Sequence, residues 1–468
     1  MSAVEVLSKF AKFIGPGILI SVAYMDPGNY STSVSGGAQF QYQLLFVVFV
    51  SNIFAVVLQC LCVKLGTITG RDLAENCRRH LPHKLNVAIF VFAELAIVAT
   101  DLAEVVGTAV ALRILFHIPL LWGVALTILD VLAILIFYKP EAQSMKQVRL
   151  FEMFVTTLVA ATVVCFILEL FKISIPNKLA VFKGYFPSTI ILENNQAMYI
   201  SLGILGATVM PHSLFLGSSV VKPRLHDYDL KQYGKVSRKP SLAAIKYTLN
   251  YSYAELIISL FLIATFVNSA ILIVAAATLH GQPDAEDADL TSIFQLLSYY
   301  ISPAAGLIFA LAMLFSGQSA GVICTMAGQI VSEGFLKWTL KPWVTRFVTR
   351  LIAILPCFFV AALFGEKGVS SILNLSQVVL SLILPIVSAP LIYFTCNSKI
   401  MSVDESRQLN PDEYEATETT ALTSRPVGKV NYANSRWLAI TSILVWITIS
   451  GLNCYLVIAY LSGADVHF

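Results

Sequence analysis

Long apolar runs recur along nearly the whole chain, and each is about the length of a helix that crosses a membrane. Such a helix needs about 20 apolar residues, whereas a membrane β-strand would alternate apolar and polar positions. The runs do not alternate, so the pattern predicts an all-α polytopic membrane protein with about eleven spans. By apolar length the spans fall near 10–38, 43–65, 85–113, 119–138, 148–171, 196–221, 247–279, 299–332, 347–364, 370–395 and 436–461.

The composition supports this class. The chain of 468 residues is 57% hydrophobic and 13% charged, with a mean hydropathy of +0.76, whereas soluble domains are about 25% charged. The net charge of +3 is too small to indicate a nucleic-acid partner. The eight cysteines show neither a disulfide framework nor a zinc-binding spacing, so we expect them to be small packing residues.

The basic residues of the loops predict the orientation. Lys and Arg gather after spans two, four, six, eight and ten, and the loops between these are poor in them. Because positive loops stay in the cytosol, the N-terminus should be cytosolic and the C-terminus lumenal or extracellular. The polar stretch 398–435 has few aromatic residues, which predicts a flexible cytosolic loop.

Two spans carry interruptions. The first contains Asp26-Pro27-Gly28-Asn29, and the sixth contains Pro211 within residues 203–217. Both segments read Gly-Ile-Leu and then have a methionine shortly before the proline. A carboxylate at the bilayer centre costs at least about 2.5 kcal/mol, so Asp26 points to function rather than to a simple proline kink.

The spacing of the interruptions predicts an inverted repeat. Five spans separate the two starts, and an odd number makes the second unit enter the membrane from the opposite face. Interrupted helices at matching positions of inverted halves indicate a secondary transporter with its site at the midplane. The halves would be 1–175, with helices one to five, and 190–397, with helices six to ten. The loop 398–435 and an additional helix eleven within 436–468 follow.

A break exposes carbonyls at the end of the first half-helix. The carbonyls of Ala23 and Ala207 would face the gap beside the Asp26 carboxylate, the Asn29 amide oxygen and the Met210 thioether. All of these groups donate electron pairs, so the ligand should be a cation. The sulfur favours Mn²⁺ or Fe²⁺ over Ca²⁺ and Mg²⁺, which prefer all-oxygen shells.

These residues carry a family resemblance. Asp26-Pro27-Gly28-Asn29 and Met210-Pro211-His212 resemble the signature pair of the Nramp family of proton-coupled divalent metal transporters. The stretch 317–335, GQSAGVICTMAGQIVSEGF, resembles the family's transport signature and departs from its usual small and hydroxyl residues at 321–323. The resemblance implies a LeuT-like fold of five plus five helices with helices one and six discontinuous. It also implies metal contacts at the five groups above, with Gln59 and Gln377 near the metal.

Span three carries three acids, Glu94, Asp101 and Glu104, on one helical face. Three carboxylates inside a membrane cannot all be ionised cheaply, so they are suited to taking up and releasing protons. A structural hydrogen-bonded network, or an ion pair with Arg350, is the alternative. The family resemblance implies proton carriage by Asp101 and Glu104, with His212 and Glu94 in supporting roles.

The expected function is proton-coupled symport of Mn²⁺ or Fe²⁺ into the cytosol by alternating access. The alternative is a cation-coupled transporter of organic solutes such as amino acids, on the same fold. We expect no enzyme activity, because no HExxH or comparable catalytic pair accompanies the acids. The expected partners are the metal ions, protons and the lipid bilayer, with a functional monomer and no cofactor. The resemblance is strongest to fungal vacuolar members, which implies the vacuole or another endomembrane, with the plasma membrane as the alternative.

Overall fold

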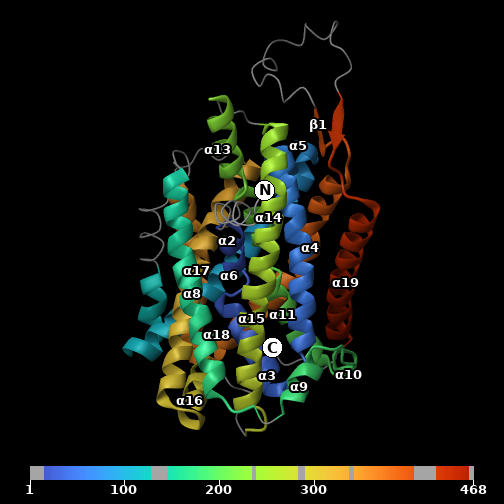
Figure 1. The fold of residues 1–468 in the computed structure, drawn as a ribbon. Helices are drawn as coiled ribbons and strands as arrows, with labels where there is room; N and C mark the ends of the chain where they lie inside the picture. The colour runs from blue at the N-terminus through green and yellow to red at the C-terminus, as the bar shows by residue number, and fades with distance from the viewer. Residues whose placement is uncertain are drawn as a thin grey trace, which may run out of the picture.

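The protein is an elongated bundle of helices in the computed structural model, which describes residues 15–127, 145–175, 177–234, 239–282, 290–336, 342–404 and 428–462 (Figure 1). The predicted all-α class is confirmed, and residues 120–127 are also helical. The elements are α2 (Pro16–Val22), α3 (Pro27–Phe40), α4 (Leu45–Thr69), α5 (Leu73–His80), α6 (His83–Phe116), α8 (Met145–Lys172), α9 (Lys178–Gly184), α10 (Ile190–Glu193), α11 (Asn195–Thr208), α12 (Pro211–Ser219), α13 (Lys222–Tyr233), α14 (Leu242–Ile258), the π-helix η2 (Ser259–Ala264), α15 (Thr265–Thr278), α16 (Leu290–Tyr300), α17 (Pro303–Leu336), α18 (Pro342–Cys396), β1 (Ser402–Asp404), β2 (Lys429–Asn431) and α19 (Arg436–Leu461).

Seven helices in the described residues are long and apolar enough to cross a membrane. They are the predicted spans two, five, six, seven, eight, ten and eleven. The other four have separate explanations: span one is divided into two short helices, and span three carries its three acids within α6. Span four lies mostly outside the described residues. Span nine contributes only the short apolar helix Ile354–Leu363.

The element α18 contains predicted spans nine and ten as two helices that meet at a kink. The kink is a single non-helical residue, Gly365, at φ 63° and ψ −146°, and it lies between the predicted ranges 347–364 and 370–395. Glycine adopts this positive φ without the steric penalty of a side chain. The two predicted helices are therefore present, and the kink lies at the first residue of the Gly-Glu-Lys-Gly stretch that separates them in the sequence.

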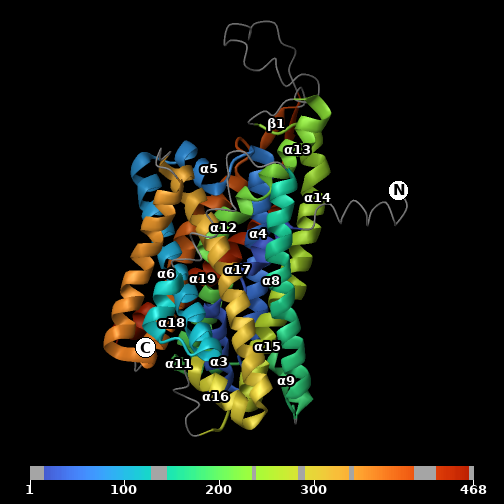
Figure 2. The same cartoon turned by 90° about the vertical axis from the view of Figure 1, so that its left-hand side faces the viewer.

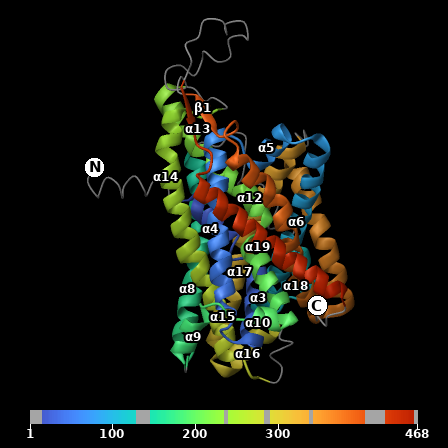
Figure 3. The ribbon, with the colours of Figure 1, turned by 90° about the vertical axis from the view of Figure 1, so that its right-hand side faces the viewer.

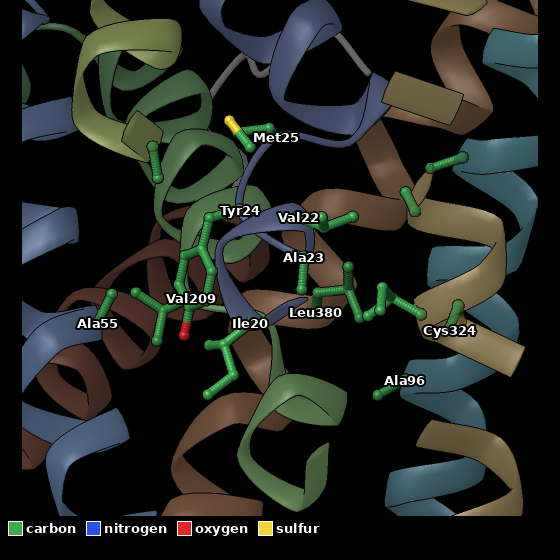
Figure 4. Packing of buried hydrophobic residues seen from close by; sticks show 14 of the residues in the cluster. Ile20, Val22, Ala23, Tyr24, Met25, Ala55, Ala96, Val209, Cys324 and Leu380 are labelled. Atoms are coloured by element: carbon green, nitrogen blue, oxygen red, sulfur yellow. The ribbon is translucent and has the colours of Figure 1, made fainter. Parts of the chain in front are cut away.

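Both predicted breaks are present, and each proline begins a half-helix. Asp26 is the N-cap of α3, with Oδ1 accepting a hydrogen bond from the Asn29 backbone N–H at 3.0 Å. Met210 is the N-cap of α12, and Pro211 is its first residue. Proline suits this position because the first helical N–H has no intrahelical partner. The interruptions therefore lie before the prolines, at residues 23–26 and 209–210. Figure 4 shows Ala23, Tyr24 and Met25 of the first break and Val209 of the second in one buried cluster.

Short elements cover the two ends of the bundle. The helices α5 and α13 and the strands β1 and β2 lie at one end, and α9, α10 and α16 lie at the other (Figure 2). The strands pair antiparallel with Val403 opposite Val430, at the two sides of the predicted loop 398–435. This pairing was not anticipated, and residues 405–427 of that loop lie outside the described part. The division into repeats at 1–175 and 190–397 stays a prediction.

An ion pair joins α5 to α13 at the first of these ends. Lys222 Nζ lies 2.5 Å from Asp72 Oδ2 and 2.8 Å from Glu75 Oε2. Asp72 and Glu75 also form the capping box of α5. Burial raises the pKa of the Glu75 carboxyl, but the Lys222 charge and the hydrogen bonds from Lys222 and Asp72 together outweigh this, and the net shift of the pKa is downward. Both carboxylates thus serve the helix start and the interhelical contact.

A buried ion pair holds the start of the first span. Arg224 of α13 donates to Glu152 of α8 through Nη1 at 2.9 Å and Nη2 at 3.1 Å, and the two side chains are 5% and 6% exposed. Beside it, the Glu255 carboxylate of α14 accepts hydrogen bonds at 2.8 Å from the backbone N–H groups of Gly15 and Gly17. These bonds satisfy orphan donors at the start of α2. The three helices α8, α13 and α14 therefore fix where the first broken span begins.

Removing one charge of the buried pair should destabilise the fold strongly. We expect Glu152→Gln to lower the free energy of unfolding by about 3–5 kcal/mol, because Arg224 stays buried without a counter-charge. The control is Asp227→Asn, which breaks the pair of Asp227 with Lys231 (2.6 Å), whose side chain is 73% exposed. That change should cost less than about 1 kcal/mol. Thermal unfolding of the purified variants measures both, and equal shifts would contradict the structural role of the buried pair.

Candidate metal-binding site

The two broken helices meet through one side chain. The Asn29 Nδ2 amide group on α3 donates to Asp26 Oδ1 at 2.7 Å and to the carbonyl oxygen of Ala207 at 2.8 Å. Asp26, Asn29 and Ala207 are all buried. Sequence analysis predicted these three residues as one site, and the structure brings them together across 178 residues of chain.

The Asn29 amide has a different orientation from the predicted one. The expectation was that its oxygen would face the gap, but here the nitrogen does, while Oδ1 accepts from Thr208 Oγ1 at 3.4 Å. Two acceptors close together need a positive group between them, and the amide N–H₂ supplies it. A half-turn of the amide would exchange its nitrogen for its oxygen. The same gap would then present only electron-pair donors to a cation.

One oxygen of the central carboxylate has no hydrogen bond. Within the described residues, Asp26 Oδ2 lacks a partner although it is fully buried. An unsatisfied buried acceptor costs about 1–3 kcal/mol, and more for a charged group. Such groups are rare in native structures and need an explanation. A bound cation would satisfy this oxygen, so the donor set fits a positive ligand.

Gln377 of α18 lies against both breaks. A Cβ atom on Gly28 would overlap the side-chain amide of Gln377, and one on Gly206 would overlap its backbone carbonyl. Only glycine therefore allows α18 to approach this closely. Gln377 Oε1 is buried and has no hydrogen-bond partner in the described chain. The prediction that Gln377 lies near the candidate site agrees with this geometry.

Gln59 of α4 contacts both broken spans from the other side. Its Nε2 donates to Tyr24 Oη at 2.9 Å, to the Ser213 carbonyl at 3.0 Å and to Ser213 Oγ at 2.9 Å. Gln59 Oε1, like that of Gln377, lacks a partner among the residues described. The amide thus links the first break to α12 and retains one acceptor.

Ala23 and Met210 occupy the breaks themselves. Ala23 is the residue that ends α2, and Met210 begins α12; both are buried. The Met210 carbonyl accepts from Ser213 N at 3.1 Å and from Ser213 Oγ at 2.7 Å. These bonds fix the backbone at the residue whose thioether was predicted to bind metal.

Sequence analysis missed the residues that hold the first break open. Asn268 Nδ2 of α15 donates to the Tyr24 carbonyl at 2.9 Å, and Ser316 Oγ of α17 donates to the Met25 carbonyl. The Tyr24 hydroxyl lies 3.1 Å from Ser213 Oγ. A buried asparagine inside an otherwise apolar span was the one available signal, because such amides usually bond to a neighbouring helix.

His212 connects the candidate site to the helix that carries the acids. Its Nδ1 lies 3.2 Å from Thr100 Oγ1 of α6, and the ring is buried. Thr100 directly precedes Asp101 in the sequence. The predicted supporting role of His212 is therefore compatible with its position between Met210 and α6.

The three predicted acids of α6 occupy two places. Asp101 and Glu104 lie with Cys324 of α17 in a buried group whose carboxylate and thiol atoms are all within 4.8 Å of one another. Glu94 is separate, and its Oε1 accepts from Ser332 Oγ of α17 at 2.9 Å. The side chain of Arg350, the predicted ion-pair partner, lies outside the described residues; only its backbone in α18 is described.

Comparison with known proteins identifies the family. The family profile described as "Natural resistance-associated macrophage protein-like", Nramp, matches residues 17–410. The chain is 71% identical to the Iron transporter SMF3 of Saccharomyces cerevisiae, over 100% of both chains. It is 45% identical to the Manganese transporter SMF1 of the same yeast, over 97% of this chain and 86% of that one.

Solved structures agree with this match. The crystal structure of the Eremococcus coleocola manganese transporter, in complex with an aromatic bis-isothiourea compound, is 30% identical with a TM-score of 0.77. The match covers 99% of this chain and 90% of that one. Mhp1, a nucleobase-cation-symport-1 family transporter, shares the fold at 14% identity and a TM-score of 0.56, over 96% and 92% of the two chains. These relatives are named as transporters rather than enzymes. With two broken helices around an acceptor-lined gap and a family match over most of its length, the chain belongs to the Nramp family.

Proposed function

We propose that the protein carries divalent transition-metal ions, Mn²⁺ or Fe²⁺, across a membrane by alternating access. The observation that carries the proposal is the buried gap between the two breaks. There Asp26 Oδ2 has no hydrogen-bond partner in the described chain, and the Asn29 amide nitrogen stands between two acceptors. The names of the relatives, an iron and a manganese transporter among them, support this cargo.

The proposed ligands are the groups predicted at the two breaks. The Asp26 carboxylate supplies the charge, and the Ala23 and Ala207 carbonyls and the rotated Asn29 amide supply further oxygens. Met210 supplies the thioether, whose softness favours Mn²⁺ and Fe²⁺ over Ca²⁺. A carboxylate substrate such as an amino acid would need hydrogen-bond donors instead, so the organic-solute alternative is not favoured.

We also propose that protons move with the metal. Asp101 and Glu104 would carry them, His212 would link them to the site, and Glu94 and Arg350 would provide the continuation towards the cytosol. The contact of His212 with Thr100 and the proximity of Asp101 to Glu104 support this route. A proton that leaves the site would then have the carboxyl groups of α6 as its acceptors.

The proposed orientation places the end with α5 and α13 in the cytosol. Basic residues in the last turn of α5, Arg78 and Arg79, support this by the positive-inside rule. We propose a vacuolar or other endomembrane location, with the plasma membrane as the alternative, and a functional monomer. The C-terminus would then be lumenal or extracellular. Fluorescence of a tag on the N-terminus in living cells identifies the compartment.

Removing the central charge should abolish transport. Asp26→Asn keeps an oxygen that can accept from the Asn29 N–H and cap α3, but it removes the charge that binds the cation. We expect Mn²⁺ affinity to fall more than about 100-fold, beyond the 10–100-fold typical for losing an outer-shell group. Uptake by proteoliposomes and calorimetric Mn²⁺ binding both measure this. Saturable uptake by a variant with the thermal stability of the wild type would contradict the proposal.

Removing the sulfur should relax selectivity. Met210→Leu keeps the volume of the side chain, and a thioether contact of about 1 kcal/mol corresponds to about a fivefold change in the affinity ratio. We expect Ca²⁺ to compete about fivefold better with Mn²⁺ for uptake. Met198→Leu is the matched control, because Met198 is buried in α11 well before the break. Equal Ca²⁺ competition in both variants would argue against a sulfur contact.

Neutralising an acid of α6 should uncouple protons from metal. Asp101→Asn keeps the shape of the side chain but cannot take up a proton. We expect Mn²⁺-driven acidification of the proteoliposome lumen to fall to the level of protein-free liposomes. A pH-sensitive dye inside the liposomes measures it, and Glu193→Gln, in the exposed helix α10, is the control. Undiminished proton influx in Asp101→Asn would rule out Asp101 as a carrier.

A further inference from the structure

A proline in α18 leaves one carbonyl of this helix without its usual donor. In an α-helix each carbonyl bonds to the N–H four residues later, and Pro385 has no N–H. The affected carbonyl is that of Ser381, which is buried within the bundle. A backbone carbonyl at membrane depth must find another donor, from a neighbouring helix or from water.

Asn453 of α19 supplies that donor. Its Nδ2 donates to the Ser381 carbonyl at 3.0 Å, and its Oδ1 accepts from Ser381 Oγ at 3.0 Å. The same Nδ2 also donates to the Ile449 carbonyl of its own helix at 2.9 Å. Both ends of the amide are therefore used. The Asn453 amide group thus takes the place of the N–H that Pro385 lacks. It also accepts a second hydrogen bond, from the Ser381 hydroxyl.

A second bond from α19 reaches the proline itself. Trp446 Nε1 donates to the Pro385 carbonyl at 2.9 Å. Helix α19 crosses α18 at a slant in the view of Figure 3. This helix lies outside the two predicted halves, yet it bonds to α18 at the carbonyls of both Ser381 and Pro385. Trp446 and Asn453 of α19 therefore both bond to the part of α18 around Pro385.

Asn453 bonds to the helical turn 377–381 of α18, and this same turn contacts the candidate site. Ser381 lies one turn after Gln377, whose amide packs on Gly28 of α3. A Cβ on Gly206, the residue before Ala207, would lie 2.8 Å from the Ser381 N atom and would overlap the Gln377 carbonyl. The segment 377–381 is thus packed between α19 on one side and both broken spans on the other.

We propose that Asn453 is a positioning residue for the cargo ion. By holding the Ser381 carbonyl, it sets the position of Gln377 and, through Gly206, of the Ala207 carbonyl relative to Asp26. The additional helix therefore takes part in metal binding without contacting the metal. This inference rests on the proposed function, because its consequence is a change in affinity for the transported ion.

The experiment compares Mn²⁺ uptake by three variants in proteoliposomes. Asn453→Ala should raise KM about three- to tenfold and leave the maximal rate within about twofold, which is the signature of lost binding rather than lost chemistry. Adding Pro385→Ala restores an N–H for the Ser381 carbonyl, so the double variant should return towards the wild-type KM. Ser442→Ala is the control, because Ser442 is buried in α19 and, among the described residues, bonds only within that helix, to the Leu438 carbonyl.

The outcomes separate this inference from the proposed function. Wild-type protein that takes up no Mn²⁺ refutes the function itself. Normal uptake with an unchanged KM in Asn453→Ala refutes the positioning role alone. A raised KM that Pro385→Ala does not lower, or an equal rise in Ser442→Ala, assigns the effect to general destabilisation and also refutes it. Asn453→Leu, which keeps the volume but removes the donor, should give the same KM shift and replaces Asn453→Ala if that variant does not fold.

Discussion

A carboxylate buried where two helices are interrupted is the constraint on which the rest of the structure depends. Asp26 is fully buried, and one of its oxygens has no hydrogen-bond partner in the described chain. The other oxygen is used twice, as the cap of α3 and as the acceptor for the Asn29 side chain. An arrangement with this much unsatisfied acceptor capacity is costly in a protein interior. A cation bound in the native state would offset this cost by coordinating the free carboxylate oxygen.

The neighbouring helices hold the backbone at the two breaks in place. Asn268 and Ser316 bind the carbonyls next to the break, so these carbonyls do not compete for the ligand. Gln59 contacts Tyr24 and Ser213, and Gln377 packs on Gly28. Each glutamine has a side-chain oxygen without a partner within the described residues. Glycines at 28 and 206 make the close approach of α18 possible. The site thus depends on backbone geometry as much as on its ligands.

The features that could be predicted from the sequence are those marked by a proline or a charged residue inside an apolar span. The breaks at Pro27 and Pro211 and the acids of α6 were visible because charge and proline are rare inside spans. The convergence of Asp26, Asn29 and Ala207 followed from the inverted-repeat argument. The orientation of the Asn29 amide was not predictable, because it depends on Thr208 and Ala207 across the interface. The division of α18 into two helices, by contrast, was predicted, and the kink at Gly365 lies between the two predicted ranges.

Other features depend on pairings that no local pattern reveals. The residues around Asn453 do not indicate its bonds to Ser381. The feature that requires such a donor is Pro385, which lies 68 residues earlier in the chain. A proline inside a span marks a carbonyl in need of a donor, but the sequence does not say which helix supplies it. The same holds for Arg224 and Glu152, which are 72 residues apart. Local patterns in the sequence therefore predict candidate ligands, whereas the supporting contacts are seen only in the structure.

The most direct test of the central claim is the position of the metal itself. Anomalous scattering at the manganese absorption edge, from crystals of the wild-type protein grown with Mn²⁺, locates the ion without reference to activity. The account predicts one strong peak between the Asp26 carboxylate, the Ala207 carbonyl and the Met210 sulfur. A peak between Asp101, Glu104 and Cys324, with none at the two breaks, would contradict it.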